Sequence, residues 1–103
     1  MIAAFSVAPS GTGDSVSAAV ADAVRVVRAS GLPHRTDAMF TTIEGGWDEV
    51  MDVVRRATEA VAAHGERVSL VLKADIRPGR TGEMQGKLDR LETAIAAADA
   101  AER

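Results

Sequence analysis

Apolar runs alternate with amphipathic stretches along this chain, and glycine or proline separates most of them. Residues 2–8 form a short apolar run that ends at a Pro- and Gly-rich turn, which predicts a first strand. Residues 67–77 alternate between apolar and polar side chains, as expected for a strand with one buried face. Two extended stretches, 34–38 and 40–44, are so close together that they predict a tight hairpin.

Two segments repeat apolar residues every three or four positions, which is the spacing of one buried helical face. The first follows a helix cap at Asp14 or Ser15 and ends at Gly31. The second opens at Gly45-Gly46 and ends at Gly65. The two predicted buried stripes are Val16, Ala19, Val20, Ala23, Val24 and Val27, and Val50, Val53, Val54, Ala57, Ala60 and Val61.

A third, Ala-rich helix is predicted from Glu83 to the C-terminus, after a loop over residues 78–82. Its apolar side chains form one seam of nearly heptad spacing: Met84, Leu88, Leu91, Ile95 and Ala98. Such a seam requires a surface to cover it, and the other two helices already occupy one face of the sheet. A partner subunit and the edge of the chain's own sheet are both possible covers.

The resulting order, β-α-β-β-α-β followed by a helix, predicts an α/β (α+β) fold of the ferredoxin-like sandwich type. We expect a single domain over residues 1–103, because this length has room for one core. In this plan an antiparallel sheet of four strands has the order 4-1-3-2, and two helices cover one of its faces. The other face is open in a monomer.

Composition excludes several classes of function. Aromatic residues make up 3% of the chain and the net charge is -3, so we expect no nucleic-acid partner. The absence of cysteine excludes disulfides and thiolate chemistry and fits a cytoplasmic protein. The first apolar run lacks a basic flank and soon turns polar, so we predict neither a signal peptide nor a membrane span. His34 and His64 stand alone in sequence, so we expect no metal site and no catalytic residue.

Polar side chains gather on the open face of the predicted sheet. If Phe5 faces the helices, strand alternation turns Thr41 inward as well. The outward set is then Ser6, Thr42, Glu44, Lys73 and Asp75. Hydroxyls, carboxylates and an ammonium group on one face suit a small hydrogen-bonding ligand, although solvated side chains on an exposed sheet would give the same pattern.

Three other features each have two interpretations. Ser10–Gly13 precedes a helix, but without a Gly-Lys-Ser/Thr ending it is better explained as an ordinary turn than as a phosphate loop. Arg77 and Arg80 flank a Pro-Gly turn and either clamp an anion or remain solvated. Trp47 either staples the start of the second helix or stacks on a ligand.

Several of these segments together resemble the small thiamine-binding protein family. They are Ala8-Pro9 with Gly13 and Ser15, Thr41-Thr42-Ile43-Glu44-Gly45 with Asp48-Glu49-Val50, and Lys73-Ala74-Asp75-Ile76-Arg77 followed by Met84 and Lys87. The resemblance covers residues 1–96. It implies a ferredoxin-like fold, sheets paired back to back in homodimers or homotetramers, and binding of thiamine or its hydroxymethylpyrimidine moiety near subunit contacts, without catalysis or a required cofactor.

The resemblance also implies roles for particular side chains. Glu44 and Asp75 would supply negative charge toward the thiazolium cation of thiamine, while hydroxyl groups would pair with the aminopyrimidine. The expected ligand-binding residues are Ser6, Thr41, Thr42, Glu44, Lys73 and Asp75. At two positions the chain departs from the pattern of this family: Phe40 stands where a small residue is expected, and Thr58 stands where a histidine is common. The Phe40 ring would either close the pocket or stack on the pyrimidine.

The first hypothesis is therefore a homo-oligomeric binder of thiamine or hydroxymethylpyrimidine, used for carriage or scavenging. A structural or regulatory oligomerisation module without a ligand is the alternative from another class. A small dimeric isomerase or cofactorless oxygenase of ferredoxin-like fold is the third, and it would need a general base for which the sequence offers no histidine.

Overall fold

The predicted strands form one antiparallel sheet in the order β2-β3-β1-β4 in a computed structural model that describes residues 1–11, 13 and 16–102. The elements are β1 (Ile2–Ser10), α1 (Ser17–Ala29), β2 (His34–Thr36), β3 (Thr41–Glu44), α2 (Trp47–Ala62), β4 (Arg67–Asp75) and α3 (Glu83–Ala101). This order and topology confirm the α+β class and the ferredoxin-like plan.

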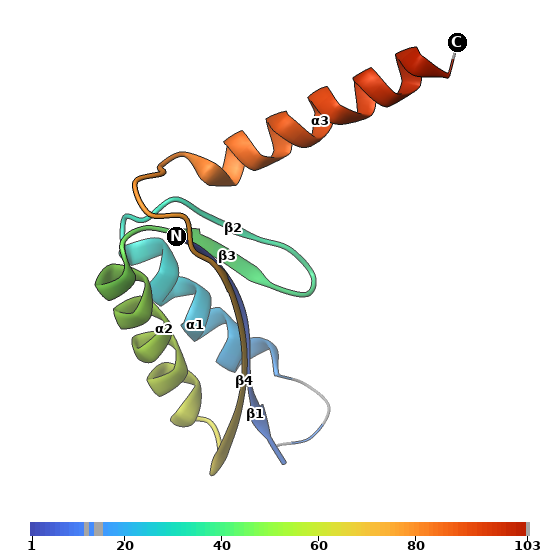
Figure 1. Ribbon diagram of the computed structural model, residues 1–103. Coiled ribbons are helices and arrows are strands. Elements are labelled where there is room, and N and C mark those ends of the chain that lie inside the picture. Colours follow the sequence, from blue (N-terminus) through green and yellow to red (C-terminus); the bar gives the residue numbers. More distant parts are fainter. Residues whose placement is uncertain (12, 14–15, 103) are drawn as a thin grey trace.

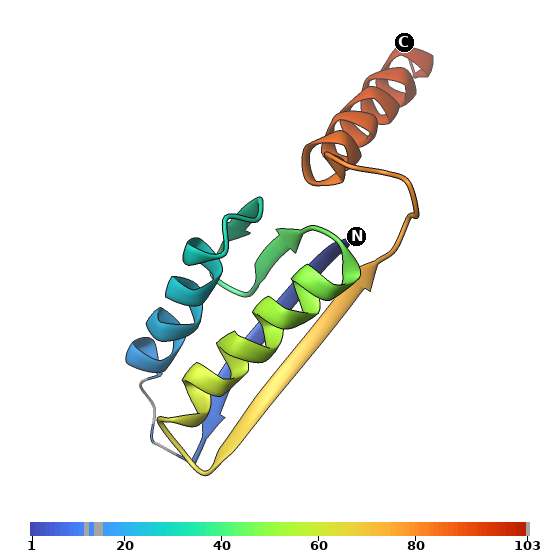
Figure 2. The ribbon, with the colours of Figure 1, turned by 90° about the vertical axis from the view of Figure 1, so that its left-hand side faces the viewer.

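Helices α1 and α2 lie across one face of the sheet, as Figure 2 shows. The core between the layers is made of apolar side chains, mostly Ala and Val: Ala3, Phe5, Val7, Ala19, Ala23, Val27, Ile43, Val50, Val53, Val54, Ala57 and Val61. Phe5 pairs with Thr41 on one side and with Leu72 on the other, so all three side chains share the face toward the helices. The predicted assignment of strand faces is therefore confirmed.

Element ends differ from the prediction where side chains bond to the local backbone. The strands of the hairpin are shorter than predicted, because Asp37 Oδ1 accepts the N–H groups of Met39 (2.8 Å) and Phe40 (3.0 Å) and closes a turn. Gly31 ends α1 with a φ of 76°, as predicted. The proposed helix caps, Asp14 and Ser15, lie outside the described residues.

Helix α3 projects away from the two-layer body (Figure 1). The radius of gyration is 16.4 Å, compared with about 13 Å for a compact domain of this length. Leu88, Leu91 and Ile95 of the predicted seam are 41%, 53% and 44% exposed. The edge of the chain's own sheet therefore does not cover this seam. No helix in the described part of the chain is both long and apolar enough to cross a membrane.

Candidate functional site

A groove of about 320 Å³ lies between the open face of the sheet and the first turns of α3. Its floor is a row of side chains across all strands, since the register pairs Arg35 with Thr42, Thr42 with Ala4, and Ala4 with Lys73. Directly paired residues point to the same side of a sheet, so these four side chains form one line. The two side chains in the middle of this line, Thr42 and Ala4, are short, and the two at its ends, Arg35 and Lys73, are long and positively charged.

The structure brings half of the predicted site residues together in this groove. Thr42, Lys73 and Asp75 line it. Ser6 pairs with Val71, two residues further along β1, and lies outside it. Thr41 is 7% exposed and faces the helices, with its Oγ1 3.1 Å from Thr36 Oγ1. Thr41 therefore stabilises the hairpin on the opposite side of the sheet.

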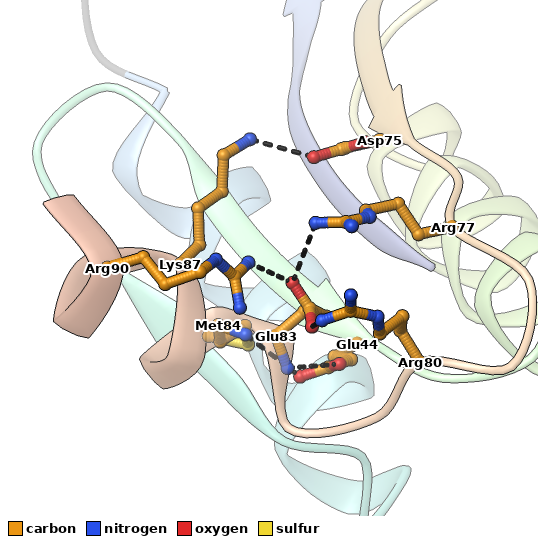
Figure 3. A network of polar contacts seen from close by, with 8 residues as sticks. All are labelled: Glu44, Asp75, Arg77, Arg80, Glu83, Met84, Lys87 and Arg90. Carbon is orange, nitrogen blue, oxygen red and sulfur yellow. Dashed lines mark hydrogen bonds and ion pairs between the residues drawn. The ribbon is translucent and has the colours of Figure 1, made fainter.

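Glu44 holds the start of α3. Its Oε2 accepts the N–H of Glu83 at 2.8 Å, and its Oε1 accepts the N–H of Met84 at 3.1 Å (Figure 3). A carboxylate suits this position because the first N–H groups of a helix have no partner within the helix. Glu44 is 7% exposed and does not line the groove. In this structure its carboxylate caps the first turn of α3.

A second carboxylate, that of Glu83, gathers three arginines at the same junction. Arg90 donates a short hydrogen bond to its Oε2, Arg80 lies 3.6 Å from its Oε1, and Arg77 lies 4.0 Å from its Oε2 (Figure 3). The hydrogen bond from Arg90 is the main reason that the pKa of Glu83 lies below its ordinary value. Arg77 and Arg80, predicted as an anion clamp or as solvated residues, thus face a buried carboxylate of their own chain.

Asp75 joins the end of β4 to α3 through an ion pair with Lys87. The Lys87 Nζ lies 2.8 Å from the Asp75 Oδ2. This hydrogen bond is the main reason that the pKa of Asp75 lies below its ordinary value, and the positive charges of Lys87, Arg77 and Lys73 also lower it. Asp75 is therefore charged at neutral pH, but its charge is already balanced within the groove.

Sequence reasoning missed the contributions of β2 and α3 to the groove. Arg35 and Asp37 reach it from the hairpin, and Met84, Lys87 and Leu88 reach it from α3. Alternation along the predicted strand 34–38 puts Arg35 and Asp37 on one face, which was a usable indication. No local pattern in the sequence indicates where α3 lies relative to the sheet, so the sequence alone does not assign its side chains to the site.

Phe40 and Thr58, which we expected to depart from the family pattern, both lie away from the groove. Phe40 is half-buried and lines a different hollow, next to α1, so its ring neither closes the groove nor faces it. Thr58 lies in α2 and donates a hydrogen bond to the Val54 carbonyl at 2.8 Å. Trp47 is 58% exposed and lines another hollow beside the loop of residues 78–82. Among residues 1–11, 13 and 16–102, no three His, Asp or Glu side chains are grouped to hold a metal ion.

Residues 3–92 match the family model described as thiamine-binding protein. UPF0045 protein Mb1933 of Mycobacterium bovis is 57% identical over 93 residues, covering 89% of this chain and 91% of that protein. The crystal structure of hypothetical protein MJ1052 from Methanocaldococcus jannaschii has a TM-score of 0.81 at 33% identity, covering 88% of this chain and 94% of that one. TM0486 of Thermotoga maritima, provisionally assigned to thiamine biosynthesis or salvage, shares the fold with a TM-score of 0.71 at 22% identity, covering 82% of this chain and 91% of that one.

Proposed function

The chain belongs to the thiamine-binding protein family, and we propose that it binds thiamine or its hydroxymethylpyrimidine moiety in the groove between the sheet and α3. The observation that carries the proposal is the composition of this groove. Thr42 offers a hydroxyl on the floor, while Ile2, Met84 and Leu88 offer apolar surface for a flat ring. The volume of about 320 Å³ is at the lower end of the usual range for small-ligand pockets, about 300–1,000 Å³.

Binding without catalysis fits the state of the two groove carboxylates. Asp75 is paired with Lys87 at 2.8 Å, and Asp37 accepts two backbone N–H groups. Both interactions lower the carboxylate pKa, which makes each group a weak general base at neutral pH. Carriage or scavenging of the ligand needs no such base.

We place the groove at a contact between copies of the chain in a homodimer or homotetramer. Val71 on the open face of the sheet is 54% exposed, and the α3 seam beside the groove is also exposed. A second copy laid on this face would bury both surfaces and close the groove over a ligand. Sedimentation or native mass spectrometry should therefore find an oligomer, and a monomer at all concentrations would contradict this arrangement.

Calorimetry with thiamine and with hydroxymethylpyrimidine tests the ligand assignment. Thr42→Val keeps the shape of the side chain but removes its hydroxyl, and we expect it to weaken binding by about threefold to tenfold. Thr58→Val is the matched control, because Thr58 lies in α2 and its hydroxyl bonds to the backbone. No binding of either compound at millimolar concentration, or equal affinity in Thr42→Val and the wild type, would contradict the proposal.

The exposed seam of α3 also supports a second candidate, an oligomerisation module without a ligand. Native mass spectrometry of the purified protein distinguishes the two, because it reports the oligomer mass and any retained small molecule together. An oligomer that retains nothing and gives no heat with either compound would favour the module.

A further inference from the structure

The charges that line the groove are unbalanced toward positive. Arg35, Lys73 and Lys87 contribute cations, while Asp37 and Asp75 contribute carboxylates. Lys87 and Asp75 neutralise each other at 2.8 Å, and two backbone N–H groups engage Asp37. Neither Arg35 nor Lys73 lies within 4 Å of a carboxylate of the described residues. Arg35 and Lys73 are therefore without an ion-pair partner among the described residues, although the Asp37 carboxylate keeps its negative charge in the same groove.

These two cations stand at opposite ends of the row that forms the groove floor. The side chains between them, Thr42 and Ala4, are short, so the space above the floor is open. Adjacent strands are about 4.8 Å apart, which puts the Cα atoms of Arg35 and Lys73 roughly 14 Å from one another. Both side chains are exposed and line the groove, and each is long enough to reach a ligand above the middle of the row.

We propose that the groove selects the phosphate-ester form of its ligand, that is, hydroxymethylpyrimidine phosphate or thiamine monophosphate over the free alcohols. This inference rests on the proposed function and names the ligand class of the same site. Arg35 and Lys73 bind the phosphate, since a guanidinium or ammonium group forms strong charge-assisted hydrogen bonds with phosphate oxygens. An acidic site for the thiazolium cation was expected from the sequence, but Glu44 is engaged by α3 and Asp75 by Lys87.

The test is calorimetry on two matched pairs of compounds at one low ionic strength. The pairs are thiamine with thiamine monophosphate, and hydroxymethylpyrimidine with its phosphate. We expect the wild-type protein to bind each ester about tenfold more tightly than its alcohol. Raising the salt concentration should reduce this preference, because exposed charges are screened. Inorganic phosphate should compete with the esters more strongly than with the alcohols.

Charge-removing variants assign the preference to the two cations. Arg35→Gln and Lys73→Gln should each lower the ratio of ester affinity to alcohol affinity to about threefold or less. Arg67→Gln is the control, since Arg67 lies on the same face of β4 at its other end and does not line the groove. Circular dichroism establishes that the exposed substitutions leave the fold intact.

The outcomes separate this inference from the proposed function. If the alcohols and esters bind equally, or if the preference survives in both variants, the phosphate assignment is overturned while thiamine binding stands. If no compound of either form binds, the proposed function fails and this inference fails with it.

Discussion

Helices α2 and α3 are attached to the same sheet by different forces. In α2 the five buried side chains are Val50, Val53, Val54, Ala57 and Val61, and each is at most 3% exposed. In α3 the buried residue is the charged Glu83, while Leu88, Leu91 and Ile95 are at least 41% exposed. Apolar packing therefore holds α2, whereas hydrogen bonds and ion pairs at one end hold α3.

The difference shows that an apolar stripe on a helix does not by itself ensure that the stripe is buried, because burial also needs a surface against which the helix can pack. Both helices carry such a stripe, but α1 and α2 already cover the closed face of the sheet (Figure 2). Helix α3 begins after the loop that follows β4 and projects away from the two-layer body (Figure 1). Polar contacts hold its first turn, while its apolar seam stays exposed.

Truncation of α2 should have the largest effect on stability. Val50 is fully buried, so Val50→Ala removes two methyl groups from the core and should lower the free energy of unfolding by about 2 kcal/mol. Urea denaturation followed by circular dichroism measures this change. A loss below about 0.5 kcal/mol would mean that α2 is not held by core packing.

Loss of the cap on α3 should have an intermediate and local effect. Glu44→Ala removes the acceptors of the Glu83 and Met84 N–H groups, which should destabilise the first turn of α3 by about 1 kcal/mol. Hydrogen exchange of these two amides measures the change, and Glu44→Gln should lose less because its carbonyl oxygen still accepts a bond. Unchanged exchange in Glu44→Ala would show that α3 is held elsewhere.

The attachment of α3 should also weaken in acid. Because Arg90 holds the pKa of Glu83 below its ordinary value of 4.5, the folded protein binds this proton less readily than the unfolded chain does. The stabilisation from Glu83 is therefore complete above pH 4.5 and is lost as the pH falls through the lowered pKa. NMR titration of the first turn of α3 follows this loss, and Glu83→Gln should abolish the contribution of this group. A Glu83 that titrates at its ordinary value would contradict the arginine cluster.

The smallest effect on the folding of a single chain is expected from the α3 seam. Leu91 is 53% exposed, so Leu91→Ala should change the free energy of unfolding of the monomer by no more than about 0.5 kcal/mol. The same substitution should weaken the proposed association, as measured by sedimentation over a range of concentrations. A loss in the monomer as large as that of Val50→Ala would show that α3 packs on its own chain in solution.

The sequence by itself determined the elements and the face of the sheet on which each side chain lies. Alternation turned Phe5 and Thr41 toward the helices, and the same alternation put Thr42, Lys73 and Asp75 together on the open face. These predictions succeed because the two-residue period of a strand is a local property that apolar burial enforces along its whole length.

Only the tertiary structure decided which polar groups meet. Glu44 accepts bonds from residues 39 and 40 positions later in the chain, and Arg35 enters the groove through the register of the hairpin. The contact of Glu44 does not follow from spacing along the chain, because hydrogen bonds between distant segments depend on where α3 begins and points. The periodicity of side chains indicates the face of the sheet on which a residue lies, whereas the group that the residue contacts there depends on the packing of the whole molecule.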